Sequence, residues 1–89
     1  MIIYTFTISG YLNDEVTWFI TLKDTIDALK DHLRAIGVSK RAHSYILDMD
    51  KYIQENEGKP LDNCYRIGYI DDIENYNPPI YLKWMFINE

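Results

Sequence analysis

The chain has a single cysteine, Cys64, and no run of hydrophobic residues of membrane-spanning length. One cysteine cannot close a disulfide within the chain, so the fold must depend on its core. A membrane-spanning helix needs about 20 consecutive apolar residues, and no stretch approaches that length. The first residues alternate Ile, Tyr and Phe with Thr and Ser, which is a strand pattern and not a signal peptide. We therefore expect a cytoplasmic protein with no membrane partner.

Positive charge is also scarce. The chain has nine Lys and Arg residues and 14 Asp and Glu residues, so its formal net charge is −5 at pH 7. The basic residues are scattered, and only Lys40 and Arg41 are adjacent. DNA and RNA are polyanions that bind stripes of clustered basic residues. The charge balance therefore predicts no direct binding of nucleic acid.

Glycine and proline are few, with four and three residues respectively, and they form no linker. No internal repeat or low-complexity tract is present, and 47% of the 89 residues are hydrophobic. This composition predicts a single globular domain over residues 1–89. The glycines are isolated from one another, so neither a P-loop nor a dinucleotide-binding loop is expected.

Metal ligands and catalytic nucleophiles are sparse as well. His32, His43 and Cys64 are the only soft ligands, whereas a structural zinc site needs four, usually in closely spaced pairs. Cys–His catalysis would require the two side chains to meet, and nothing in the sequence brings Cys64 to either histidine. We expect no metal, no cofactor, no catalytic residues and no enzymatic activity.

Four segments show the alternation of a half-buried strand. Residues 2–8 and 16–22 are separated by Asn13-Asp14, a turn pair, and together predict a hairpin. Two further strands are predicted where Tyr65, Ile67 and Tyr69 alternate with polar residues, and over residues 80–86.

A helix is predicted over residues 24–36. Its apolar residues recur at helical spacing, Asp24 is placed to cap its start, and Gly37 follows its end. Residues 39–57 favour a second helix, with Ala42, Ile46, Met49 and Ile53 as its stripe, although residues 43–49 could instead form a short strand. The predicted fold is α+β, an antiparallel four-stranded sheet with two helices on one face, in the order β-β-α-α-β-β.

The eight tyrosines and a set of outward-facing apolar residues suggest a binding surface. If the strands at 16–22 and 80–86 were neighbours, Phe19, Tyr81 and Met85 would form a patch on the uncovered face of the sheet. Tyr76 lies in an acidic loop nearby in sequence. Tyrosine is enriched in protein interfaces, because it contributes both apolar area and a hydrogen bond. The alternative is that a loop covers this patch.

Two acidic groups are candidates for binding a partner. Asp24, Asp27 and Asp31 share one face of the first predicted helix, and Asp71, Asp72 and Glu74 lie in the loop before the last strand. The alternative for the helix is an ordinary solvated face with Asp27–Lys30 and Asp31–Arg34 pairs.

These features favour a small protein-interaction module that docks on a basic site of another protein. An inhibitor or adaptor, such as a phage or mobile element encodes against a host nuclease or defence complex, would have this character. Two alternatives remain. One is a homo-oligomeric assembly protein, for example a homodimer, that associates through its uncovered sheet face. The other is a nucleic-acid mimic.

Overall fold

The computed structural model describes residues 1–10, 16–62, 65–71 and 77–88. One antiparallel sheet contains β1 (Ile2–Ile8), β2 (Ala42–Ser44), β3 (Tyr65–Ile70) and β4 (Pro79–Phe86), in the spatial order β1-β4-β3-β2. The helices are α1 (Leu22–Ala35) and α2 (Met49–Asn56), and a 3-10 turn, η1, spans Ser39–Arg41. The predicted α+β class, with its four antiparallel strands and two helices, is confirmed.

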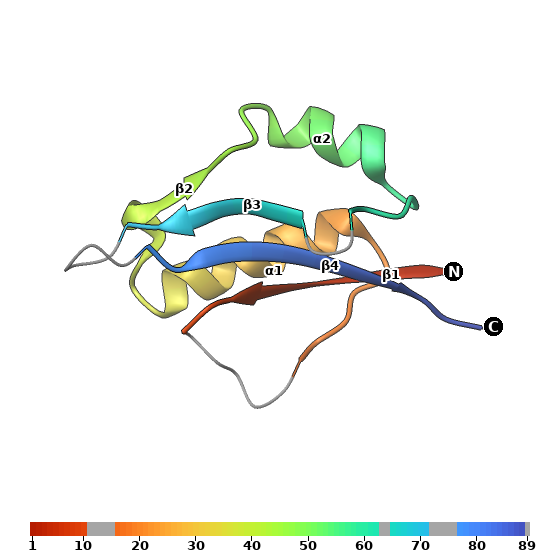
Figure 1. The fold of residues 1–89 in the computed structure, drawn as a ribbon, viewed down its shortest axis with the longest axis horizontal. Helices are drawn as coiled ribbons and strands as arrows, with labels where there is room; N and C mark the ends of the chain where they lie inside the picture. Colours follow the sequence, from red (N-terminus) through yellow and green to blue (C-terminus); the bar gives the residue numbers. More distant parts are fainter. Residues whose placement is uncertain (11–15, 63–64, 72–76, 89) are drawn as a thin grey trace.

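Helix α1 runs behind the sheet in Figure 1. Strand β2 forms one edge of the sheet, and α2 lies beyond that edge. Side chains from α1 meet those of β1 and β4 in one core, and Met49, Tyr52 and Ile53 of α2 pack against the same core. The residues of this core that are less than a tenth exposed are Tyr4, Ile8, Leu22, Ile26, Leu29, Leu33, Val38, Leu61, Ile67, Ile70, Ile80 and Leu82.

Helix α1 follows its predicted stripe but begins two residues earlier than expected. Thr21, not Asp24, is the N-cap: its hydroxyl oxygen accepts from the Asp24 N–H at 3.1 Å. At the other end, Gly37 has a φ of 77°, the left-handed conformation expected of a helix-terminating glycine.

A residue distant in sequence completes the start of α1. The carboxylate of Glu57 accepts from the N–H of Leu22 at 2.6 Å and from the N–H of Lys23 at 3.1 Å. The Thr25 N–H donates to the Thr21 carbonyl at 3.2 Å. The Thr25 bond is the first of the regular helix, and the N–H groups of the three residues before it, which a helix start leaves without an intrahelical partner, are all satisfied. Glu57 also places a negative charge at the positive end of the helix dipole.

The predicted strand at 16–22 is wrong. Only Phe19 pairs with the sheet, through two backbone hydrogen bonds with Tyr4 of 2.7 and 2.8 Å. The alternation ends at Thr21, because that residue caps α1 and Leu22 already belongs to the helix. The other side of β1 is paired along its whole length with β4, so the expected hairpin is replaced by a contact between the two ends of the chain.

The predicted helix over 39–57 is only partly correct. The helix is limited to α2, and the preceding residues form η1 and the short strand β2, which overlaps the strand alternative only at His43 and Ser44. Asp48 explains the late start, because its side chain caps α2 by accepting from the Lys51 N–H at 3.1 Å. With β2 as the fourth strand, the element order becomes β-α-β-α-β-β, apart from η1.

Two side-chain hydrogen bonds fix the segment after α2 to the sheet. The hydroxyl of Tyr4, a fully buried residue, donates to the Lys59 carbonyl at 2.8 Å. The indole N–H of Trp84 donates to the Leu61 carbonyl. These bonds hold residues 57–61 near the start of α1, where Glu57 acts. None of the described helices has the length and apolar character needed to cross a membrane.

Candidate functional site

The sheet has one face toward α1 and one face that no described helix covers. Residues paired across antiparallel strands point to the same side. Tyr4 pairs with the partly buried Trp84, and the buried Ile8 pairs with Ile80, so these side chains define the core side. The intervening positions belong to the opposite side, which we call the outer face. Its residues are Ile3, Thr5, Thr7, His43, Tyr45, Arg66, Tyr69, Tyr81, Lys83 and Met85.

A β-bulge decides which residues of β3 reach the outer face. The register shifts between Arg66 and Gly68, so Ile67 is an extra residue that stays buried. Before the bulge Arg66 pairs with Tyr81, and after it Tyr69 pairs with Pro79. Strict alternation would have placed Tyr69 on the same side as Ile67, and the bulge moves it to the outer face.

Gly68 is required at this bulge. A Cβ atom built there would lie 2.0 Å from the backbone oxygen of His43, far inside the contact distance. Glycine therefore permits β2 to approach β3 closely enough to pair.

Aromatic rings gather on the outer face where β2 meets β3. The rings of His43 and Tyr69 stack with centroids 5.0 Å apart, and Tyr45 lies against Tyr69 at 5.7 Å. The guanidinium carbon of Arg66 is 5.7 Å from the centre of the Tyr45 ring, a cation–π distance. Tyr45 is still 54% exposed and Met85 is 41% exposed, so part of this apolar area faces solvent.

The charge of the outer face differs from that of the whole chain. The four described strands contain no Asp or Glu, although the chain has 14 of them. Arg66 and Lys83 are the strand residues with a full positive charge, and both belong to the outer face. The outer face is therefore an aromatic and cationic surface on a protein of net charge −5.

The predicted acidic row on α1 exists, but basic side chains of the same helix pair with two of its three acids. Asp24, Asp27 and Asp31 are exposed. Asp27 lies 3.0 Å from the Lys23 ammonium, and Asp31 lies 3.5 Å from the Arg34 guanidinium. The hydrogen bond with Asp27 raises the pKa of Lys23. Helix α1 has three acidic residues and three basic ones, Lys23, Lys30 and Arg34, so the row is not a strongly negative surface.

The other predicted site residues are not brought together. Phe19 pairs with Tyr4 and so belongs to the core side, whereas Tyr81 and Met85 belong to the outer face. The expected patch of these three therefore loses Phe19. Asp71 is exposed just after β3, and Asp72, Glu74 and Tyr76 lie outside the described residues.

The candidate metal and catalytic ligands are separated. His32 packs against Phe6 at 5.7 Å on the core side, and His43 stacks on Tyr69 on the outer face. Cys64 lies outside the described residues. Within the described residues, no group of three or more His, Cys, Asp or Glu side chains could hold a metal ion.

Sequence reasoning missed the aromatic group of the outer face. It favoured a helix for His43 and Tyr45, with a short strand over 43–49 as the alternative, and alternation placed Tyr69 on the same side as Ile67. The available signal was Gly68 inside a strand pattern, which is typical of a bulge or of close backbone approach. Comparisons with protein-family profiles, curated proteins and solved structures find no significant match to this chain, so its function must be inferred from this geometry.

Proposed function

We propose that this chain is a protein-interaction module, an adaptor or inhibitor, that docks on its partner through the outer face. The observation that supports this most directly is the combination of exposed aromatic and apolar side chains with an acid-free set of strands. Tyr45 and Met85 are about half exposed, and no described helix covers them. Exposed apolar area rimmed by polar groups marks interaction surfaces in small proteins.

The partner surface that fits the outer face is acidic and partly apolar. Arg66 and Lys83 supply two positive charges, and the rings of Tyr45, Tyr69 and Tyr81 supply apolar area with hydroxyl groups. The basic partner surface expected from the sequence depended on the acidic row of α1 and on the acidic loop of Asp71, Asp72 and Glu74, of which only Asp71 is among the described residues. The surface around that row is less negative than three aspartates alone would make it, because Asp27 and Asp31 are paired with bases of the same helix.

A protein partner is favoured over nucleic acid for two reasons. Nucleic-acid binding depends on neutralising several phosphates, whereas the strands supply only two full positive charges on a chain of net −5. Aromatic platforms that bind single strands also present ring faces to stacked bases. Here the face of His43 is already stacked on Tyr69, at 5.0 Å.

The decisive experiment compares matched surface variants in capture from the native host followed by direct binding measurement. Tyr45→Ala, Arg66→Glu and Met85→Ala alter the outer face, and Asp24→Asn and Asp31→Asn alter the exposed face of α1. Loss of an interface hot spot costs about 2 kcal/mol or more, roughly 30-fold in Kd. We expect such a loss for at least one outer-face variant and less than about threefold change for the α1 variants.

The opposite pattern would overturn the proposal. If a partner bound the outer-face variants normally and lost affinity for Asp24→Asn and Asp31→Asn, the acidic row would be the docking surface. Saturable binding of a labelled single-stranded oligonucleotide, abolished by Arg66→Glu, would replace a protein partner by nucleic acid.

Self-association is a second candidate, favoured by the segment beside β1. Val16, Trp18 and Ile20 are exposed by 57%, 38% and 66%, and in this segment only Phe19 pairs with the sheet. Two copies that paired along this edge would cover these side chains. Light scattering at high concentration tests the idea: a dimer that Ile20→Lys dissociates would support it, and a monomer at every concentration would exclude it.

A further inference from the structure

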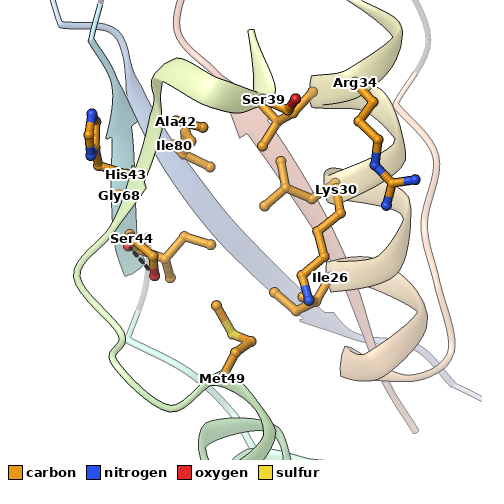
Figure 2. A pocket seen from close by; sticks show the side chains of 13 residues that line it. Ile26, Lys30, Arg34, Ser39, Ala42, His43, Ser44, Met49, Gly68 and Ile80 are labelled. Carbon is orange, nitrogen blue, oxygen red and sulfur yellow. Dashed lines mark hydrogen bonds between the residues drawn. The ribbon is translucent and has the colours of Figure 1, made fainter.

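A cleft of about 340 Å³ lies on the side of the sheet opposite the outer face. It lies between α1 and the chain from η1 to β2, with the start of α2 at one end (Figure 2). Few cavities larger than a water molecule are normal in a protein core, whereas small-molecule sites begin at about 300 Å³. The cleft is therefore of ligand-binding size.

The walls of the cleft are apolar and belong to the core. They include Ile26, Leu29, Leu33, Ile67 and Ile80, each no more than 7% exposed. The space arises where the sheet contributes Ala42, which has a small side chain. Because the core residues of the walls expose so little surface, they form the base of the cleft, and an occupant would contact mainly the less buried lining residues Ala42 and Met49.

The mouth of the cleft is cationic. Figure 2 shows Lys30 and Arg34 extending from successive turns of α1 beside the opening. Among the described residues, no carboxylate lies within ion-pairing distance of Lys30, and Arg34 shares Asp31 at 3.5 Å. Ser39 and Ser44 supply hydroxyl groups on the facing wall, and His43 points away from the cleft.

No Asp or Glu is among the described residues that line the cleft, in a chain with 14 of them. An apolar interior with two cations at its mouth is complementary to a molecule with an apolar tail and one anionic head. A carboxylate fits these cations, because a guanidinium and an ammonium both donate charge-assisted hydrogen bonds to it.

We propose that the cleft binds a medium-chain monocarboxylate, with its unbranched acyl tail along Ala42 and Met49 and its carboxylate between Lys30 and Arg34. This site goes beyond the proposed function, since it uses the opposite side of the sheet. Either proposal can fail without the other.

The test is an NMR titration of the whole chain with decanoate. Two control ligands separate the contributions: 1-decanol has the tail without the charge, and acetate has the charge without the tail. We expect saturable amide shifts at Leu29, Leu33, Ala42 and Met49 with decanoate, at least tenfold weaker binding of decanol, and no saturable binding of acetate.

Variants then assign the site. Lys30→Met should weaken decanoate binding about tenfold, which corresponds to about 1.4 kcal/mol. Lys23→Met is the matched control, because it removes a lysine of the same helix away from the cleft, and it should leave the affinity unchanged. Ala42→Leu fills the cleft and should abolish binding. Amide spectra and thermal melting show whether this variant folds, and Lys30→Met together with Arg34→Met keeps the proposal testable if it does not.

Three results would overturn the proposal. The first is the absence of saturable shifts up to about 1 mM decanoate, a Kd equivalent to only about −4 kcal/mol. The second is binding that Lys30→Met leaves unchanged or that decanol reproduces. The third is a set of shifts at Trp18, Ile20 or Met85 in place of the cleft residues, which would show general adsorption to exposed apolar area.

Discussion

Replacing Glu57 by alanine should destabilise the protein at a helix that lies 35 positions earlier in the chain. Glu57 follows the last turn of α2, and its carboxylate accepts from the N–H groups of Leu22 and Lys23 at 2.6 and 3.1 Å. Loss of a helix cap costs about 0.5–2 kcal/mol, and an unsatisfied buried N–H costs about 1–3 kcal/mol. Leu22 is fully buried, so water cannot readily replace its lost partner.

We expect a loss of about 2 kcal/mol, which lowers Tm by roughly 8–16 °C in a domain of this size. Thermal melting followed by circular dichroism measures it, and amide hydrogen exchange should accelerate at Leu22 and Lys23. Glu57→Gln keeps an acceptor oxygen and should lose less. Glu55→Ala is the matched control. The Glu55 carboxylate is exposed and makes only a long ion pair with Lys51, at 4.0 Å, which contributes about 0.5 kcal/mol or less to stability. Equal melting temperatures for Glu57→Ala and Glu55→Ala would refute the reasoning.

Three further results are expected. Tyr4→Phe should cost about 1–2 kcal/mol in chemical denaturation, because it leaves the Lys59 carbonyl without its 2.8 Å donor; an unchanged midpoint would contradict this. Gly68→Ala should detach β2 and weaken partner binding together with stability, because the new Cβ meets the His43 oxygen at 2.0 Å; normal NMR contacts between His43 and Tyr69 in that variant would show the opposite. Burial raises the pKa of Tyr52 to about 12, with smaller effects from Tyr65, Tyr4 and Asp62, so the folded state holds this proton more tightly than the unfolded chain. Stability should therefore fall between about pH 10 and 12, by about 1–2 kcal/mol after allowance for solvent screening, and Tyr52→Phe should reduce that fall in alkaline melts.

The parts of the fold that the sequence predicted well depend on local physics. Helix α1 was predictable because Ile26, Leu29 and Leu33 recur at helical spacing and Gly37 terminates the helix. The first strand and the last were predictable because their alternation matches burial in β1 and β4.

The parts that were missed depend on contacts between distant residues. Val16, Trp18 and Ile20 alternate as a strand would, but β4 fills one side of β1 and Phe19 alone pairs on the other. The negative charge of Glu57 is unfavourable at the C-terminal end of α2, yet its carboxylate stabilises the start of α1. Neither relationship is visible in a window of neighbouring residues.

The candidate site shows the same division. The sequence showed which residue types were available for an interface, and two of the predicted residues, Tyr81 and Met85, do share the outer face. Alternation alone could not predict which residues of β3 point to the outer face, because the bulge at Ile67 moves Tyr69 to the same side as His43. The aromatic group exists only because β2, a strand of three residues, pairs with β3.

The distribution of charge over the described elements differs from what the net charge of the whole chain suggests. A net charge of −5 describes the whole chain, but docking depends on the charges within about one Debye length, roughly 10 Å at 0.1 M salt. The described strands contribute only positive charge, and α1 contributes equal numbers of acidic and basic residues. The excess of acids must therefore lie outside the strands and α1, so neither the outer face nor the mouth of the cleft has the sign of the whole protein. Both surfaces are therefore complementary in charge to negatively charged ligands, which is the basis of the two proposals.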